Sequence, residues 1–216
     1  MTIAAIAEQL VSGMATSFAI FALTLIFSLP LGLLISFGRM SKNKLVKWIF
    51  KIYISIMRGT PLMLQLFVVY YGPFFLFGIR ITSEYRFWAA IIGFVLNYAA
   101  YFAEIYRSGI ESMPVGQYEA AQVLGYSKSQ TFMRIIFPQV VKRIIPPVTN
   151  EVITLVKDTS LAFVISVAEM FSAAKAIAAA QASVTALVVA GVFYYVFNLV
   201  VAFVMEAVEK KLNYYR

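Results

Sequence analysis

Five long apolar runs constrain the fold of this chain more than any other feature. They cover approximately residues 10–37, 48–77, 87–105, 144–167 and 184–208. A helix needs about 20 predominantly apolar residues to cross the hydrocarbon core of a bilayer, and each run is close to that length or longer. We therefore predict an all-α polytopic membrane protein with about five transmembrane helices, formed by residues 1–216 as a single transmembrane domain.

The composition excludes an ordinary soluble enzyme. Hydrophobic residues make up 62% of the chain and charged residues 13%, against about 45–50% and about 25% in a typical soluble domain. The chain has no Cys and no His, which excludes disulfides, thiolate or His-ligated metal sites and a Ser-His-Asp triad. We expect no catalytic site and no metal site. The first apolar run is too long for a cleavable signal peptide, and no basic residue precedes it.

The basic residues predict the topology. The formal net charge is +8, and 14 of the 18 Lys and Arg residues lie in three segments: 39–58, 107–143 and the tail after residue 208. Short basic loops mark the cytoplasmic side of a membrane protein. The pattern predicts an N-terminus outside and a cytoplasmic C-terminus. This distribution of basic residues explains the positive net charge by membrane topology. We therefore expect no nucleic-acid partner.

The loop between the third and fourth runs, residues 111–143, contains signals for two short helices. Residues 117–124 can form two turns, and Gly125 suits a left-handed C-terminal cap. Ser127 and Gln130 have the spacing of a capping box that starts a second helix. Two interpretations remain open: an element that docks on a partner protein, or an interfacial helix on the lipid surface. Three residues form its expected apolar face: Tyr118, Ala121 and Leu124.

The same loop resembles the EAA loop of permease subunits in bacterial ABC importers. The resemblance rests on Glu119-Ala120-Ala121, Gly125 and Ile135-Ile136-Phe137-Pro138. One departure is Phe137, where the family usually has Leu, and both residues are apolar. Further stretches narrow the resemblance to the amino-acid branch, of the histidine, arginine and glutamine type: Arg58-Gly59-Thr60-Pro61-Leu62 with Gln65-Leu66, Asn97-Tyr98-Ala99-Ala100-Tyr101, Glu104-Ile105-Tyr106-Arg107 and Lys157-Asp158-Thr159-Ser160-Leu161.

The resemblance implies the type I ABC importer permease fold in a bacterial plasma (inner) membrane. It also implies partners: an ATP-binding cassette ATPase subunit in two copies, an extracytoplasmic solute-binding protein, and a second permease copy or homologue, with a homodimer favoured. The chain lacks G-x-x-x-x-G-K-[ST], so ATP and Mg would be bound by the ATPase subunit and no cofactor is expected in this chain.

By this resemblance, the loop forms a coupling helix that sits on the ATPase. The expected coupling residues are Glu119, Ala120, Ala121 and Gly125. The two alanines are small enough for a partner surface to approach closely, and Gly125 permits a sharp turn. Glu119 can make a charge-assisted hydrogen bond at a helix end or to the partner.

Polar residues within the third and fourth runs follow a helical spacing. Asn97, Tyr101, Glu104 and Ser108 form one stripe, and Glu151, Thr154 and Asp158 form another. Ionisable groups inside a membrane are costly and by default functional, so we predict that the stripes line the pathway. Glu104 and Asp158 would neutralise the ammonium or cationic side chain of an amino acid. The expected substrate-binding set is Asn97, Tyr101, Glu104, Asp158, Thr159 and Ser160, the last two holding the carboxylate through backbone or hydroxyl groups.

A structural interpretation of these charges is also open. Glu104, Arg107 and Glu111 have the spacing of local helical ion pairs. Lys157 could pair with Glu151 or Asp158 of its own or a second copy.

The interruption of the second run predicts a kink. Pro61 removes a backbone donor and Gly59 adds conformational freedom. Arg58, Gly59 and Pro61 are therefore candidates for a gate or hinge, the alternative being a kinked helix with a purely structural role.

We conclude that the sequence predicts the permease subunit of an ATP-driven importer for polar or basic amino acids, such as arginine, histidine, lysine or glutamine. An alternative is a secondary transporter or channel driven by an ion gradient. A membrane-embedded enzyme is the poorest interpretation, because its chemistry would rest on carboxylates and Lys157 alone.

Overall fold

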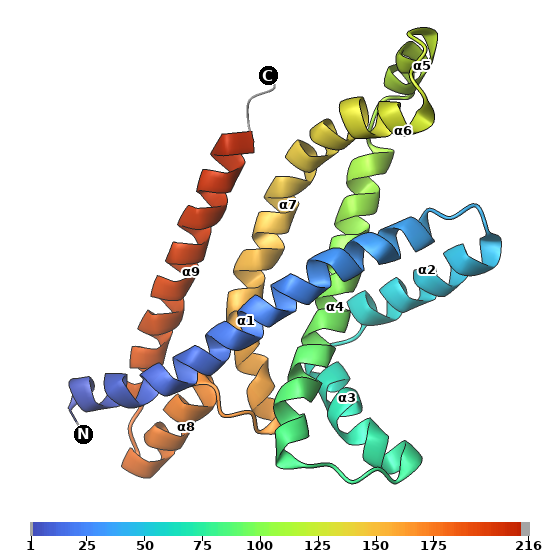
Figure 1. The fold of residues 1–216 in the computed structure, drawn as a ribbon. Helices are drawn as coiled ribbons and strands as arrows, with labels where there is room; N and C mark the ends of the chain where they lie inside the picture. The colour runs from blue at the N-terminus through green and yellow to red at the C-terminus, as the bar shows by residue number, and fades with distance from the viewer. Residues whose placement is uncertain (1, 213–216) are drawn as a thin grey trace.

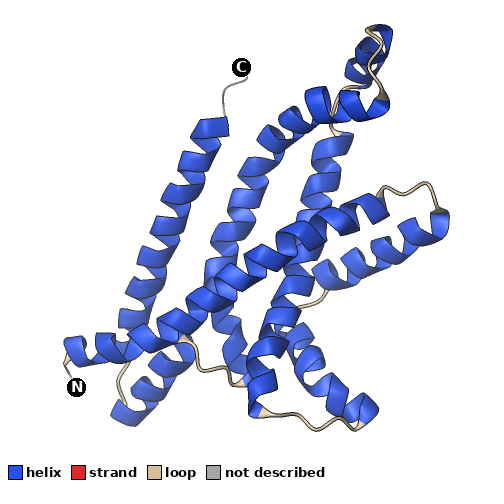
Figure 2. Ribbon diagram, viewed as in Figure 1, coloured by secondary structure: helices blue, strands red, loops and turns tan. Residues whose placement is uncertain are grey.

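The computed structural model describes residues 2–212, and this part of the chain consists of helices and the loops between them, without a strand (Figure 2). Arg216, which we counted with the basic tail, lies outside the described residues. The elements are α1 (Ile3–Arg39), α2 (Lys44–Gly59), α3 (Leu62–Phe77), α4 (Ser83–Glu111), α5 (Val115–Val123), α6 (Lys128–Thr131), the π-helical turn η1 (Phe132–Ile136), α7 (Phe137–Asp158), the 3₁₀ segment η2 (Thr159–Ile165), α8 (Met170–Gln181) and α9 (Thr185–Leu212).

The prediction of about five membrane-crossing segments is confirmed by length and composition. Three helices, α1, α4 and α9, are long and apolar enough to cross a bilayer alone. Two further crossings are bent pairs. The α2–α3 pair turns by 112°, and the helical stretch that ends in η2 turns by 60° into α8. The second apolar run is therefore a broken helix, and the fourth run ends where the chain bends into α8.

Helix α1 lies diagonally across the other long helices and packs most extensively on α4 (Figure 1). A glycine permits this close crossing. A Cβ atom on Gly32 would lie 2.8 Å from Cβ of Phe102 and 3.0 Å from the carbonyl oxygen of Ala99. The main apolar core surrounds the crossing and includes Ile20, Phe94 and Leu155, all fully buried.

Helices α5 and α6 project from one end of the molecule, beyond the ends of α4 and α7, while α3 and α8 lie toward the other end (Figure 1). The sequence prediction for this loop is confirmed in detail. Gly125 has φ = 77°, the left-handed conformation of a helix C-cap. Both bonds of the capping box are present: the Gln130 amide donates to Ser127 Oγ (3.3 Å), and the Ser127 amide donates to Gln130 Oε1 (2.9 Å).

A buried carboxylate forms hydrogen bonds with both the first and the last helix of the structure. Glu169 is fully buried at the start of α8 and accepts hydrogen bonds from the amides of Phe171 (2.7 Å) and Ser172 (2.7 Å). It also accepts bonds from the hydroxyls of Tyr194 in α9 (3.1 Å) and Ser17 in α1 (3.4 Å). The Glu169 side chain thus caps α8 and connects it to α1 and α9 by hydrogen bonds.

Candidate functional site

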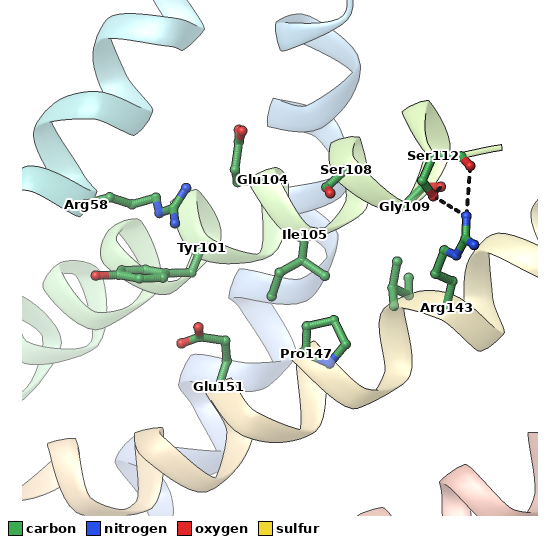
Figure 3. Close-up of a pocket in the computed structure, with 11 residues that line it drawn as sticks. Arg58, Tyr101, Glu104, Ile105, Ser108, Gly109, Ser112, Arg143, Pro147 and Glu151 are labelled. Carbon is green, nitrogen blue, oxygen red and sulfur yellow. Dashed lines mark hydrogen bonds between the residues drawn. The ribbon is translucent and has the colours of Figure 1, made fainter. Parts of the chain in front are cut away.

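Two cavities lie between α4 and α7. The first, of about 330 Å³, is lined from α4 by Tyr101, Glu104 and Ser108 and from α7 by Glu151, with Arg58 at the end of α2 closing one side (Figure 3). The helical spacing explains the arrangement, because residues three or four apart on a helix share a face.

The second cavity, of about 400 Å³, lies next to the first. Its wall contains Asn97, Tyr101, Thr154 and Asp158, and also residues 60–62 at the break between α2 and α3. Tyr101 and Glu151 line both cavities. The two predicted polar stripes therefore face one another across two neighbouring cavities. Their contact with a substrate stays a prediction.

Arg58, in the wall of the first cavity, lies over the ring of Tyr101, which lines both cavities. The guanidinium carbon of Arg58 lies 5.2 Å from the centre of the Tyr101 ring (Figure 3), within the range of a cation–π interaction. Arg58 makes no ion pair with a carboxylate in the part of the chain that the structure describes. Its charge is therefore available to groups in the cavity.

Asp158 is held by an aromatic hydroxyl rather than by a cation. Tyr98 on α4 donates a hydrogen bond of 2.7 Å to its Oδ2. Lys157 forms no ion pair with Asp158 or Glu151 within residues 2–212, so the intrachain pairing that we considered is wrong. Tyr98 was missed by sequence reasoning, although it lies three residues from Tyr101 within the recognised motif.

Glu104 fits both interpretations of the sequence, because it forms a local helical ion pair and also lines a cavity. Arg107 forms ion pairs with Glu104 and with Glu111, as the i, i+3 and i, i+4 spacing predicted. The Glu104 side chain nevertheless lines the first cavity and remains 23% exposed. A ligand there would meet a carboxylate whose charge is already partly compensated.

The hydroxyls of Thr159 and Ser160 are bonded to the backbone, and substrate binding by these two residues stays a prediction. Their hydroxyls donate to the carbonyl oxygens of Val156 and Lys157, both at 2.8 Å. Thr159 is fully buried, and neither residue lines either of the two cavities. The reason is local: α7 tightens into a 3₁₀ segment at this point, and each hydroxyl bonds to the carbonyl three residues earlier.

Asn97 stabilises the break between α2 and α3 through hydrogen bonds. This buried amide donates to the carbonyl oxygen of Met57 (3.1 Å) and to Gln65 Oε1 (2.9 Å). Gln65 in turn donates to the carbonyl oxygens of Met57 (2.9 Å) and Thr60 (3.1 Å). The two amides satisfy backbone groups that the break leaves without helical partners. Gln65 was not among our site residues, although it belongs to a stretch that carries the family resemblance and is an amide within an apolar run.

The predicted kink at Gly59 and Pro61 is confirmed by the 112° bend between α2 and α3. Pro61 is the N-cap of α3 and has φ = −61°, as its ring requires. The role of Arg58, Gly59 and Pro61 as a gate or hinge stays a prediction.

The 111–143 loop exposes only some of the residues expected to couple to an ATPase. Glu119 and Ala120 are exposed, and Gly125 forms the turn after α5. Ala121 is only 1% exposed, while Leu124 is 73% exposed, so they do not form one continuous outer face. The small side chain of Ala121 packs inside the loop in this structure, and its contact with a partner stays a prediction.

Comparisons with known proteins agree with this architecture. The family described as "binding-protein-dependent transport system inner membrane component" matches residues 28–214. The arginine transport system permease protein ArtQ of Bacillus subtilis is 38% identical over 94% of this chain and 92% of its own length. The L-cystine transport system permease protein TcyB of the same organism is also 38% identical, over 89% of this chain and 82% of its own.

Among solved structures, an amino acid ABC transporter crystallised with histidines superposes with a TM-score of 0.85 at 30% identity. The match covers 94% of this chain and 94% of that one. The fold and the facing polar helices thus define a permease subunit of an ABC transporter, a non-catalytic membrane protein. The chain belongs to the family of binding-protein-dependent transport system inner membrane components, and within it to the amino-acid permeases.

Proposed function

We propose that this chain forms the translocation pathway of an ATP-driven importer for polar or basic amino acids. The observation that carries the proposal is the pair of polar stripes on α4 and α7, which face one another across two neighbouring cavities. A relative named for arginine transport, 38% identical, supports a cationic substrate. The equally similar relative named for L-cystine leaves the individual amino acid open.

In the proposed pathway, Asp158 binds the α-ammonium group of the substrate. It lines the second cavity and is oriented by Tyr98. The first turn of α3 lies in the wall of the same cavity, and Pro61 provides no side-chain cap there. Uncapped amides at a helix N-terminus favour anions. We therefore propose this turn as the binding site of the α-carboxylate, in place of Thr159 and Ser160. A cationic side chain would then extend toward Glu151 and Glu104.

Arg58 would act as a gate between the cavities. Its stacking on Tyr101, a residue in the wall of both cavities, places a cation beside them. A cationic substrate that passed this point would have to displace it. Gly59 and Pro61, at the 112° bend, would allow the end of α2 to move during that step.

The proposed orientation has the N-terminus outside and the C-terminus in the cytoplasm of a bacterial inner membrane. Helix α9 ends on the side of the molecule from which α5 and α6 project, whereas α1 begins toward the other side (Figure 1). Five crossings and the basic segments described above agree with this orientation.

The proposed partners are two ATPase subunits that bind ATP and Mg, a solute-binding protein and a second permease copy. A homodimer is favoured, because five crossings are few to enclose a pathway and most homo-oligomers are two-fold symmetric. The exposed Glu119 and Ala120 on α5 would contact the ATPase.

Reconstitution into liposomes tests this function. The chain would be inserted with and without an ATP-binding cassette subunit that co-purifies with it, ATP would be enclosed, and uptake of radiolabelled arginine, histidine and glutamine would be followed. We expect uptake only with ATP and the ATPase subunit. Uptake by the chain alone, driven by an ion gradient, would support the secondary-transporter alternative and contradict the proposal.

A further inference from the structure

A reciprocal pair of amides connects α5 to α7. Nε2 of Gln117 donates to Oε1 of Gln139, and Nε2 of Gln139 donates to Oε1 of Gln117, both at 2.9 Å. Gln139 also donates to the carbonyl oxygen of Ile135 (2.7 Å) in the π-helical turn. Two hydrogen bonds between the same two side chains fix their mutual orientation more strictly than one, because both must be aligned at once.

A second polar bridge lies one helical turn further along α7. Nη1 of Arg143 donates to the carbonyl oxygen (2.8 Å) and to Oγ (2.9 Å) of Ser112, the C-cap of α4. Gln139 and Arg143 are four residues apart and therefore share a face of α7. This face thus holds both the end of α4 and the start of α5.

Without these bridges α5 would be loosely attached. A short non-helical link that ends at Pro114 precedes α5. The left-handed Gly125 follows its C-terminal cap. Beneath it lies an open cavity of about 450 Å³, lined by Gln117, Gln139 and Arg143, so apolar packing between α5 and α7 is incomplete there. Among the described residues, the Gln117–Gln139 pair provides the side-chain hydrogen bonds between α5 and α7, and the Arg143–Ser112 bridge holds the end of α4 beside them.

Helix α7 runs on from these bridges to the substrate cavities. Glu151 lies 12 residues beyond Gln139, which corresponds to roughly 18 Å along a helix, and Asp158 ends the helix. Gln139 therefore belongs to the same helix as both carboxylates.

We propose that the Gln117–Gln139 pair is the element that transmits movement of α5 to α7, so that it determines how much transport each ATP hydrolysis drives. Gln117 and Gln139 are positioning residues: they contact neither cavity between α4 and α7. This inference rests on the proposed function, in which α5 sits on an ATPase.

The first test compares single substitutions in the reconstituted complex. Gln117→Leu and Gln139→Leu remove the bonds at similar volume, and Gln122→Leu, at an exposed position on the same helix, is the matched control. We expect all three variants to retain the ATPase subunit and to hydrolyse ATP within about twofold of the parent. Uptake per ATP hydrolysed should fall at least fivefold in Gln117→Leu and Gln139→Leu and stay unchanged in Gln122→Leu.

The second test restores the connection reversibly. The chain contains no Cys, so the double variant Gln117→Cys/Gln139→Cys carries the only two thiols of the permease. With a cysteine-free ATPase subunit, a short bis-methanethiosulfonate linker should raise uptake per ATP to within twofold of the parent, and reduction should abolish the gain. A merely destabilising pair of substitutions would not respond to the linker in this way.

The outcomes separate the two levels of the proposal. Three outcomes would overturn the transmission role while the parent complex still transports. They are parental uptake per ATP in both leucine variants, loss of the ATPase subunit from these variants, and no recovery of uptake with the linker. A parent complex without ATP-dependent uptake would overturn the proposed function itself, and this inference with it.

Discussion

The hydroxyl of Tyr98 on α4 donates a hydrogen bond of 2.7 Å to Asp158 at the end of α7, so a neutral group orients the carboxylate of the second cavity. Asp158 forms no ion pair within the described residues, in contrast to Glu104, which is paired with Arg107. The two pathway carboxylates therefore differ in how much charge they can offer a ligand.

This difference predicts unequal effects of neutralising them. We expect Asp158→Asn to lower uptake of radiolabelled arginine by about tenfold or more, the equivalent of about 1.4 kcal/mol of lost interaction. Glu104→Gln should have a smaller effect, because Arg107 already compensates its charge. Tyr98→Phe keeps the carboxylate and should raise KM a few-fold. Parental uptake in both Asp158→Asn and Glu104→Gln would show that the polar stripes do not bind the substrate.

The α5 surface predicts opposite consequences for two adjacent alanines. Ala120 is exposed and Ala121 is buried. Ala120→Trp should abolish co-purification of the ATPase subunit while the thermal unfolding of the permease stays unchanged. Ala121→Trp should instead disturb the loop, because overpacking a filled site is destabilising, and its proteolysis should be faster. Retention of the ATPase by Ala120→Trp would argue against α5 as the docking element.

The Glu169 cluster predicts a large loss of stability on truncation. Glu169→Ala leaves the amides of Phe171 and Ser172 and the hydroxyl of Tyr194 without their acceptor. We expect the free energy of unfolding to fall by about 2–5 kcal/mol. Glu169→Gln retains one acceptor oxygen and should lose less. Thermal unfolding in detergent measures both, and equal melting temperatures for Glu169→Ala and the parent would contradict this role.

The crossing of α1 and α8 predicts a strict requirement for glycine. A Cβ atom on Gly13 would lie 2.7 Å from Cα of Met170, which is backbone and cannot rotate away. Gly13→Ala should therefore destabilise the protein by about 1–3 kcal/mol. Gly191 in α9 has no neighbouring atom within 4 Å of such a Cβ, so Gly191→Ala should stabilise by about 0.5–1 kcal/mol. Parallel melting curves of the two variants compare them, and equal shifts would refute the distinction.

The features that the sequence predicted well depend on short stretches of chain. Hydropathy alone identified the apolar runs, and the Ser127–Gln130 spacing identified the start of α6, because capping is decided within four residues. The facing stripes on α4 and α7 followed from helical periodicity. Local ion pairing of Glu104, Arg107 and Glu111 was predictable for the same reason.

The features that the sequence could not predict depend on distant partners. Glu169 and Ser17 are 152 positions apart, and no local pattern links them. Asn97 and Gln65 meet only because α4 packs against the break before α3. Ala121 belonged to a family motif, but which side of α5 faces inward depends on how the loop folds back. The 3₁₀ segment at Thr159 and Ser160, in which both hydroxyls bond to the backbone, also had no signal in the sequence.

The break between α2 and α3 also has a consequence for hydration. Each helix has 16 residues, a length of about 24 Å, which is less than the roughly 30 Å of a bilayer's hydrocarbon core. Non-helical backbone at that depth is stable only where protein or water satisfies it. Asn97 and Gln65 satisfy part of this backbone, and residues 60–62 open onto the second cavity. We therefore expect the break to keep a column of water inside the membrane, through which a charged solute can move without entering lipid.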